Sequence, residues 1–261
     1  MNLQLALRLV QSIIAIAIFF QSLENLILRN YFSENGIWRW SQTIQDLNFL
    51  PRLILKVFDF LLKDKHFIFL LWARLISSFL LIFYPSLLFI LILFLSSFFI
   101  AQRFRGSFNG GSDYMSFIIL SALSVQALVP FAMVTKGVLW YIAIQAATSY
   151  FSAGIVKLKL DSWRSGQALT KFIQSPNYNP PLLMKNLLNQ KPIALISSWV
   201  IMIFELSFPM ILIQKNTGYI LIWLLLGFIF HFVNVFAFGL NRFLLVWMAT
   251  YPAIYFCTLY R

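Results

Sequence analysis

Long apolar runs dominate this chain and alternate with short polar connections. A helix that crosses a bilayer needs about 20 apolar residues, with roughly 17 as the lower limit. Eight runs approach that length, at residues 5–28, 67–84, 86–101, 114–134, 137–156, 192–213, 218–239 and 243–259. The second and third are separated at Tyr84-Pro85, where a tight turn is expected. The pattern predicts an all-α, polytopic transmembrane helix bundle of about eight spans; because three runs are short, six or seven spans also fit.

Two connections are long, at residues 29–65 and 157–191. Within the first, apolar positions recur at helical spacing over residues 49–63 with charges every few residues, which predicts an amphipathic helix lying in the membrane interface. The second contains Ser-Pro-Asn-Tyr-Asn-Pro-Pro at 175–181, which cannot belong to a continuous helix. No internal repeat is detectable, so we expect a single membrane domain over residues 1–261.

Composition supports a membrane protein and argues against a nucleic-acid-binding one. Of the 261 residues, 61% are hydrophobic and only 11% are charged, whereas soluble domains carry roughly a quarter charged residues. The net charge of +12 comes from basic residues in loops beside the apolar runs. That placement favours contact with anionic lipid headgroups and orientation by loop charge. The expected location is the cell membrane, as a multi-pass protein. Loop charge favours the more basic face in the cytoplasm, but basic residues gathered for a substrate would bias that count, so both orientations stay open.

Ionisable residues at membrane depth indicate a functional site by default. Arg74 and His231 lie roughly 12 Å from the basic face, and Glu24 lies roughly 6 to 8 Å from it, at a helical rise of about 1.5 Å per residue. Asp113 lies at the end of its span that meets the basic face. Glu205 is counted roughly 20 Å deep along its own span, apart from the others. We therefore expect a polar cavity that opens toward the basic face. Pairing of Arg74 with Glu24 and a merely packed His231 are the structural alternatives.

Lys157 ends an apolar run and begins a polar loop. An amine at the boundary of hydrocarbon and water loses its proton more easily than one in bulk water, because desolvation disfavours the charged form. A neutral lysine can act as a base or a nucleophile. The alternative is a lysine whose stem lies in lipid while its ammonium reaches water. The two histidines and the single cysteine provide no metal-type cluster, so no metal site is expected.

The residues around Lys157 form a motif. Tyr150-Phe151-Ser152-Ala153-Gly154, then Lys157, then Trp163-Arg164-Ser165-Gly166 resembles the central motif of the vitamin K-dependent gamma-carboxylase family and its bacterial relatives, the HTTM (horizontally transferred transmembrane) domain proteins. The family's active-site lysine falls on Lys157, while the lysine before it is replaced by Val156. The small members include a membrane protein of the sporulation-delaying toxin maturation system.

The resemblance implies a function that the residues alone do not give. It implies an enzyme that modifies or matures a peptide at the membrane, with Lys157 as base and His231, Asp113 and Glu205 as positioning or proton-relay groups. Cavity residues would be Arg74, Glu24, Tyr150, Trp163 and Gly166. The implied cofactor is a reduced quinone, and the implied partners are a secreted peptide and other membrane proteins. An immunity or scaffold subunit without catalysis is the alternative, and a transporter comes third.

Overall fold

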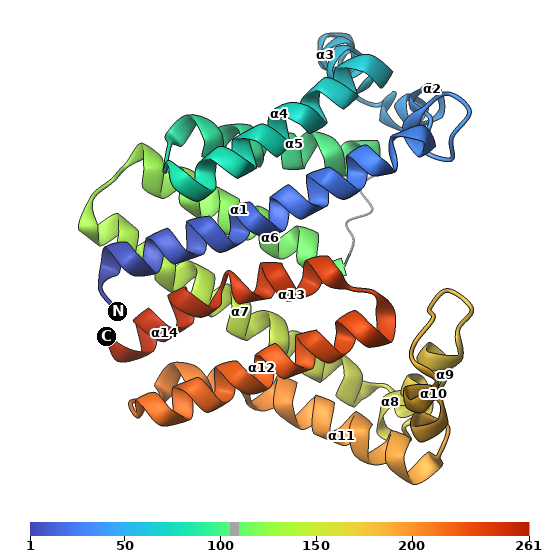
Figure 1. Cartoon of the computed structure of the whole chain (residues 1–261), viewed down its shortest axis with the longest axis vertical. Helices are drawn as coiled ribbons and strands as arrows, with labels where there is room; N and C mark the ends of the chain where they lie inside the picture. Colours follow the sequence, from blue (N-terminus) through green and yellow to red (C-terminus); the bar gives the residue numbers. More distant parts are fainter. Residues whose placement is uncertain (105–109, 261) are drawn as a thin grey trace. The chain divides into compact units, whose positions relative to one another are not determined.

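The computed structural model describes residues 1–104 and 110–260, and its regular elements are helices (Figure 1). The described chain divides into two compact units. The N-terminal unit comprises Leu7–Val138, and the C-terminal unit comprises Met1–Ala6 with Leu139–Arg261. Each unit is described by itself below.

The N-terminal unit contains four long helices and a cluster of short ones. Its elements are α1 (Leu3–Ile27), η1 (Arg29–Phe32), α2 (Trp40–Thr43), η2 (Ile44–Leu47), α3 (Arg52–Leu62), α4 (Asp64–Phe83), α5 (Leu87–Arg103), α6 (Gly110–Leu128) and the first turns of α7 (Ala132–Lys159). The helix predicted within residues 49–63 is α3. Its apolar spacing buries Phe58 and Leu62, and Phe58 contacts Phe99 at 5.5 Å between ring centroids.

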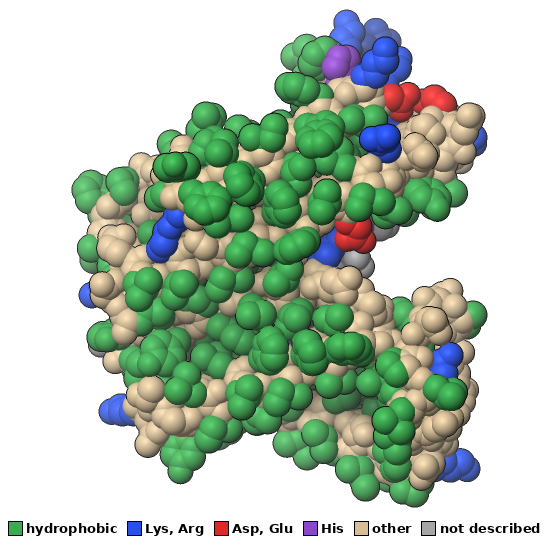
Figure 2. Space-filling model, viewed as in Figure 1, with side chains coloured by type: hydrophobic (Ala, Val, Ile, Leu, Met, Phe, Trp, Pro, Cys, Tyr) green, Lys and Arg blue, Asp and Glu red, His purple; other side chains and the backbone are tan. Residues whose placement is uncertain are grey.

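The opposite face of α3 carries exposed apolar side chains. Leu53 is 75% exposed and Phe60 is 61% exposed. Basic side chains gather over this helix and the turn that follows it (Figure 2), and they are Arg52, Lys56, Lys63 and Lys65. An apolar face flanked by cations is typical of a helix in the membrane interface, and that location stays a prediction.

A buried arginine ties these short helices to the long ones. The guanidinium of Arg103, at the end of α5, lies 5.5 Å from the ring centroid of Trp40 and 5.2 Å from that of Phe67. Arg103 also donates to the Phe32 carbonyl and lies 3.6 Å from Asp64. Cation–π contacts are strongest when the cation is desolvated, so Arg103 helps to hold α2 against α4 and α5.

The C-terminal unit carries the rest of α7 and all later elements. These are α8 (Asp161–Arg164), α9 (Gln167–Gln174), α10 (Leu182–Leu188), α11 (Lys191–Ser207), η3 (Phe208–Ile213), α12 (Thr217–Phe238), α13 (Asn241–Met248) and α14 (Tyr251–Leu259). The amine of Met1 donates to the Tyr260 hydroxyl at 3.4 Å, so the two ends of the chain lie side by side (Figure 1).

Among the described residues, six helices are long and apolar enough to cross a membrane. They are Leu3–Ile27, Asp64–Phe83, Ala132–Lys159, Lys191–Ile213, Thr217–Phe238 and Asn241–Leu259. The protein is therefore a multi-pass, all-helical membrane protein, but the count of about eight spans is not confirmed. The other two predicted runs form α5, which is shorter, and α6, which opens with polar residues.

Proline sets the breaks in the apolar runs. α4 ends at Phe83, and Tyr84 is extended before Pro85, which confirms the predicted turn. Pro209 lies in the first positions of η3 and Pro252 in those of α14. Because proline lacks an amide hydrogen, it is tolerated in the first turn of a helix but not in the interior. The sixth and eighth predicted runs are accordingly each divided into two helical segments.

Candidate functional site

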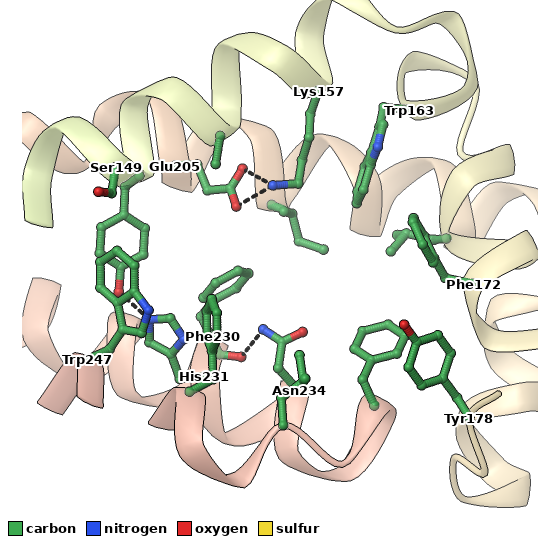
Figure 3. A pocket seen from close by; sticks show the side chains of 17 residues that line it. Ser149, Lys157, Trp163, Phe172, Tyr178, Glu205, Phe230, His231, Asn234 and Trp247 are labelled. Carbon is green, nitrogen blue, oxygen red and sulfur yellow. Dashed lines mark hydrogen bonds and ion pairs between the residues drawn. The ribbon is translucent and has the colours of Figure 1, made fainter. Parts of the chain in front are cut away.

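The C-terminal unit contains a partly open cavity of about 300 Å³. Most of its lining is apolar and aromatic, including Phe172, Phe230, Phe238 and Phe243. The wall comes from α7, α11, α12 and α13, together with the α8–α10 segment (Figure 3). A concave, largely apolar space with a few polar groups is the usual form of a small-molecule site.

Lys157 and Glu205 form an ion pair on one wall of this cavity. Lys157 Nζ lies 2.6 Å and 2.7 Å from the two carboxylate oxygens of Glu205. The side chain of Glu205 is 3% exposed and that of Lys157 is 19% exposed. Side chains on a helix lean toward its N-terminus, so Lys157, near the end of α7, reaches back into the protein. It is not a lysine that extends outward to water.

The depth count that set Glu205 apart from Lys157 was wrong. It assumed that α11 starts level with the end of α7. The first turns of α11 instead pack beside α8, where Ser198 Oγ donates to the Trp163 carbonyl at 2.5 Å and Trp199 Nε1 donates to the Arg164 carbonyl at 3.2 Å. Glu205 lies seven residues beyond Ser198, which is roughly 10 Å along a helix, and the two side chains close the remaining distance.

The α8–α10 segment forms part of the cavity wall. Trp163, Phe172 and Tyr178 all line the cavity from this segment, and Lys157 Nζ lies 5.2 Å from the ring centroid of Trp163. Gly166 makes the close approach possible: its φ is +77°, and a Cβ added there would lie 2.6 Å from the Leu195 nitrogen. Only glycine meets both conditions without strain.

His231 and Tyr150 belong to another part of the wall. The Tyr150 hydroxyl and His231 Nε2 are 2.5 Å apart, and the His231 ring stacks on Trp247 at 5.1 Å between centroids. Tyr150 is buried and stacks on Phe208 at 3.9 Å. His231 is thus hydrogen-bonded and packed, as the structural alternative predicts, and it also lines the cavity.

Three predicted site residues lie in the N-terminal unit and do not line this cavity. Arg74 Nη2 donates to Gln21 Oε1 at 2.8 Å, and Gln21 Nε2 donates to Asp113 Oδ1 at 2.9 Å. Arg74 also donates to the Leu93 carbonyl, Ser96 and Ser97. Arg74 is buried while Glu24 is exposed. The Arg74–Glu24 pair and the catalytic role of Asp113 stay predictions.

Several lining residues escaped the sequence analysis. Ser149 and Asn234 are polar. Asn234 lies one turn after His231 on α12, so helical spacing from His231 could have found it. Phe172 and Tyr178 had no such signal, because the fold of the 157–191 connection decides where they lie. Outside the cavity, Gln21, the partner of Arg74 in the N-terminal unit, is polar within an apolar run and could have been noted on that ground.

The cavity has the walls for an apolar, ring-containing molecule and hydrogen-bonding groups at Lys157 and Glu205. Aromatic walls can pack on a flat ring, and the Lys157–Glu205 pair supplies hydrogen-bonding and proton-transfer groups. Within the described residues, no group of three His, Cys, Asp or Glu could hold a metal ion.

Comparison with known proteins gives one family. The family model of the HTTM domain matches residues 122–258, which is more than half of the chain and includes every residue that lines the cavity. No curated protein and no solved structure matches the chain. The chain belongs to the HTTM domain family.

Proposed function

We propose that this integral membrane protein is an enzyme in which Lys157 acts as a base on an apolar, hydroxyl-bearing molecule. The proton transfer would be one step in the modification or maturation of a peptide at the membrane. The observation that supports this most directly is the position of Lys157 Nζ, in the wall of an apolar cavity and within 2.7 Å of both Glu205 oxygens.

The pair offers a way to present a neutral amine without leaving a charge in hydrocarbon. With the proton on Lys157, the pair is an ammonium and a carboxylate; with the proton on Glu205, it is an amine and a carboxylic acid. Its net charge is zero in both forms. Since an isolated charge is costly at membrane depth, a partner that can hold the proton makes the amine available as a base.

In the proposed step, Lys157 Nζ accepts a proton from a hydroxyl of the bound molecule. The O–H bond breaks, its electron pair stays on oxygen, and the amine becomes an ammonium. Glu205 then remains beside the ammonium as its hydrogen-bond partner. A reduced quinone would supply the acidic hydroxyl, held by the aromatic walls from α9, α12 and α13. The resemblance to the gamma-carboxylase family suggests the quinone and the peptide; the cavity supports only the apolar, hydroxyl-bearing class.

Oxygen uptake by durohydroquinone tests the base. The hydroquinone anion reacts with O2 faster than the neutral form, giving the quinone and hydrogen peroxide. The protein in lipid nanodiscs should accelerate this uptake. Lys157→Ala should lower the rate about 10²-fold or more, the usual contribution of a general base. Lys157→Arg should lose as much, because a guanidinium stays protonated.

Val156→Phe is the matched control, since Val156 neighbours Lys157 on α7 but is 58% exposed; its rate should equal that of the unmodified protein. Ala153→Phe, which fills the cavity from the same helix, should abolish acceleration. Full activity in Lys157→Arg would contradict the proposal and favour the scaffold or immunity alternative.

A further inference from the structure

The cavity has two polar regions, and only the first is used above. The Lys157–Glu205 pair lies on the α7 and α11 side, while Asn234 and His231 lie on α12 across the cavity (Figure 3). Asn234 Nδ2 donates to the Phe230 carbonyl at 2.9 Å, one turn earlier on α12. The side chain is only partly buried, so the other atoms of its amide are available to a ligand.

Two buried polar atoms on the same side lack partners. Within the described residues, His231 Nδ1 and Trp247 Nε1 are buried and have no hydrogen-bond partner. Their rings are stacked, with an interplanar angle of 21°, and both residues line the cavity. Buried polar groups are nearly always hydrogen-bonded, and leaving one unpaired costs free energy. A polar atom that enters this region would relieve that cost.

We infer that Asn234, His231 and Trp247 form a second ligand-binding subsite, which recognises an oxygen on the side of the ligand opposite the hydroxyl that faces Lys157. This inference rests on the proposed function. The ligand class is a substituted flat ring with hydrogen-bonding oxygens on two opposite edges. The cavity of about 300 Å³ is large enough for such a ring, since an engineered cavity of roughly 150 Å³ holds benzene.

Tyr150 is a positioning residue for this subsite. Its hydroxyl holds His231 Nε2 at 2.5 Å, which leaves Nδ1 as the ring nitrogen that can bind a ligand. The hydrogen bond also fixes the rotation of the imidazole, as partners of a histidine commonly do. Phe204, Phe208 and Trp247 pack around the Tyr150 ring, so Tyr150→Phe removes the hydroxyl while keeping the packing.

Two probes that differ by one hydroxyl test the subsite. Durohydroquinone carries hydroxyls on opposite edges of its ring, and 2,3,5,6-tetramethylphenol carries one. Calorimetric titration under argon into protein-containing nanodiscs, with empty nanodiscs subtracted, gives both affinities. The diol should bind about tenfold more tightly, the effect of one well-placed hydrogen bond. Asn234→Leu should remove most of this preference and leave the affinity for tetramethylphenol unchanged.

Tyr150→Phe should lower the affinity for the diol about two- to fivefold through the loosened His231. Val233→Leu, an exposed neighbour of Asn234 on α12, should change neither affinity.

Equal binding of the two probes to the unmodified protein would overturn the subsite and leave the base proposal standing. An unchanged diol affinity in Tyr150→Phe would remove its positioning role. Binding of neither probe would overturn both proposals, whereas a diol preference with full oxygen uptake in Lys157→Ala would overturn the base alone.

Discussion

At the scale of single residues, charge is tolerated in this protein where a partner lies on a neighbouring helix. Lys157 has Glu205, Arg74 has Gln21 and the α5 serines, and Arg103 has Asp64 and two aromatic rings. In a bilayer the alternative to a partner is an uncompensated charge in hydrocarbon. Polar contacts therefore stabilise particular pairings of helix faces, and the pair Lys157–Glu205 does this between α7 and α11.

Breaking that pair should cost stability in a non-additive way. Lys157→Met leaves a buried carboxylate and Glu205→Gln leaves a cation without its counter-charge, so each should lower the free energy of unfolding by a few kcal/mol. The double variant should lose clearly less than the sum, with a coupling of about 1 kcal/mol or more. Unfolding followed by intrinsic fluorescence in detergent measures the cycle. Additive losses would mean that the two side chains do not interact.

At the scale of elements, glycines decide how closely helices approach one another. Gly154 on α7 faces α11: a Cβ added there would lie 2.9 Å from Leu206 Cγ and 3.1 Å from Glu205 Cβ. Gly166 likewise allows the α8–α9 turn to lie close to α11, against Leu195. The cavity therefore depends on two close contacts with α11, one at each side of the Lys157–Glu205 pair.

Gly154→Ala should separate α7 from α11 and weaken the Lys157–Glu205 pair. We expect a lower melting temperature and a loss of oxygen uptake of about tenfold, because a displacement of about 1 Å at a catalytic group has large effects. Gly137→Ala is the control on the same helix, where an added Cβ meets nothing within 4 Å. It should stabilise slightly, since alanine favours helix. Equal behaviour of the two variants would refute the close contact.

Gly166→Ala should release the α8–α10 segment from α11. Both a positive φ and a 2.6 Å approach to the Leu195 nitrogen oppose the new Cβ. Gly239→Ala has a similar φ of +68° but open space around it, so it should show only the strain of roughly 1–2 kcal/mol. Hydrogen exchange over residues 161–188 should rise strongly in the first variant and little in the second. A comparable rise in both would assign the effect to backbone strain alone.

At the scale of the whole molecule, the chain is a multi-pass membrane protein with helical connections outside its spans. Within the C-terminal unit, the end of α7 and the start of α11 lie on the side that carries α8–α10, and the α11–α12 connection lies at the other end. Loop charge predicts that the α8–α10 side faces the cytoplasm.

Cysteine labelling tests this arrangement. The native Cys257 is fully buried, so background reaction with a membrane-impermeant maleimide should be low. Lys159→Cys and Lys191→Cys should react only when the reagent reaches the cytoplasmic face, and Lys215→Cys only from the opposite face. All three positions are exposed. Labelling of Lys159→Cys and Lys215→Cys from the same side would contradict the path of the chain through the membrane.

The sequence by itself determined the local features. Apolar runs, prolines and turn residues act over a few positions, so the helices, the break at Pro85, the helix α3 and the irregular stretch at 175–181 could all be predicted. The motif around Lys157 likewise marked the part of the chain that forms the cavity. These features need no knowledge of which helices become neighbours.

Only the tertiary structure decided which polar groups meet. The Lys157–Glu205 pair depends on how far the start of α11 extends beside α8, and the Tyr150–His231 contact depends on the rotation of α7 against α12. Trp163, Phe172 and Tyr178 reach the cavity from the 157–191 connection, and their positions depend on how that connection folds back. Helical periodicity fixes the face of a residue on its own helix, but the packing of side chains between helices fixes depth and partner. That packing is a property of contacts far apart in sequence.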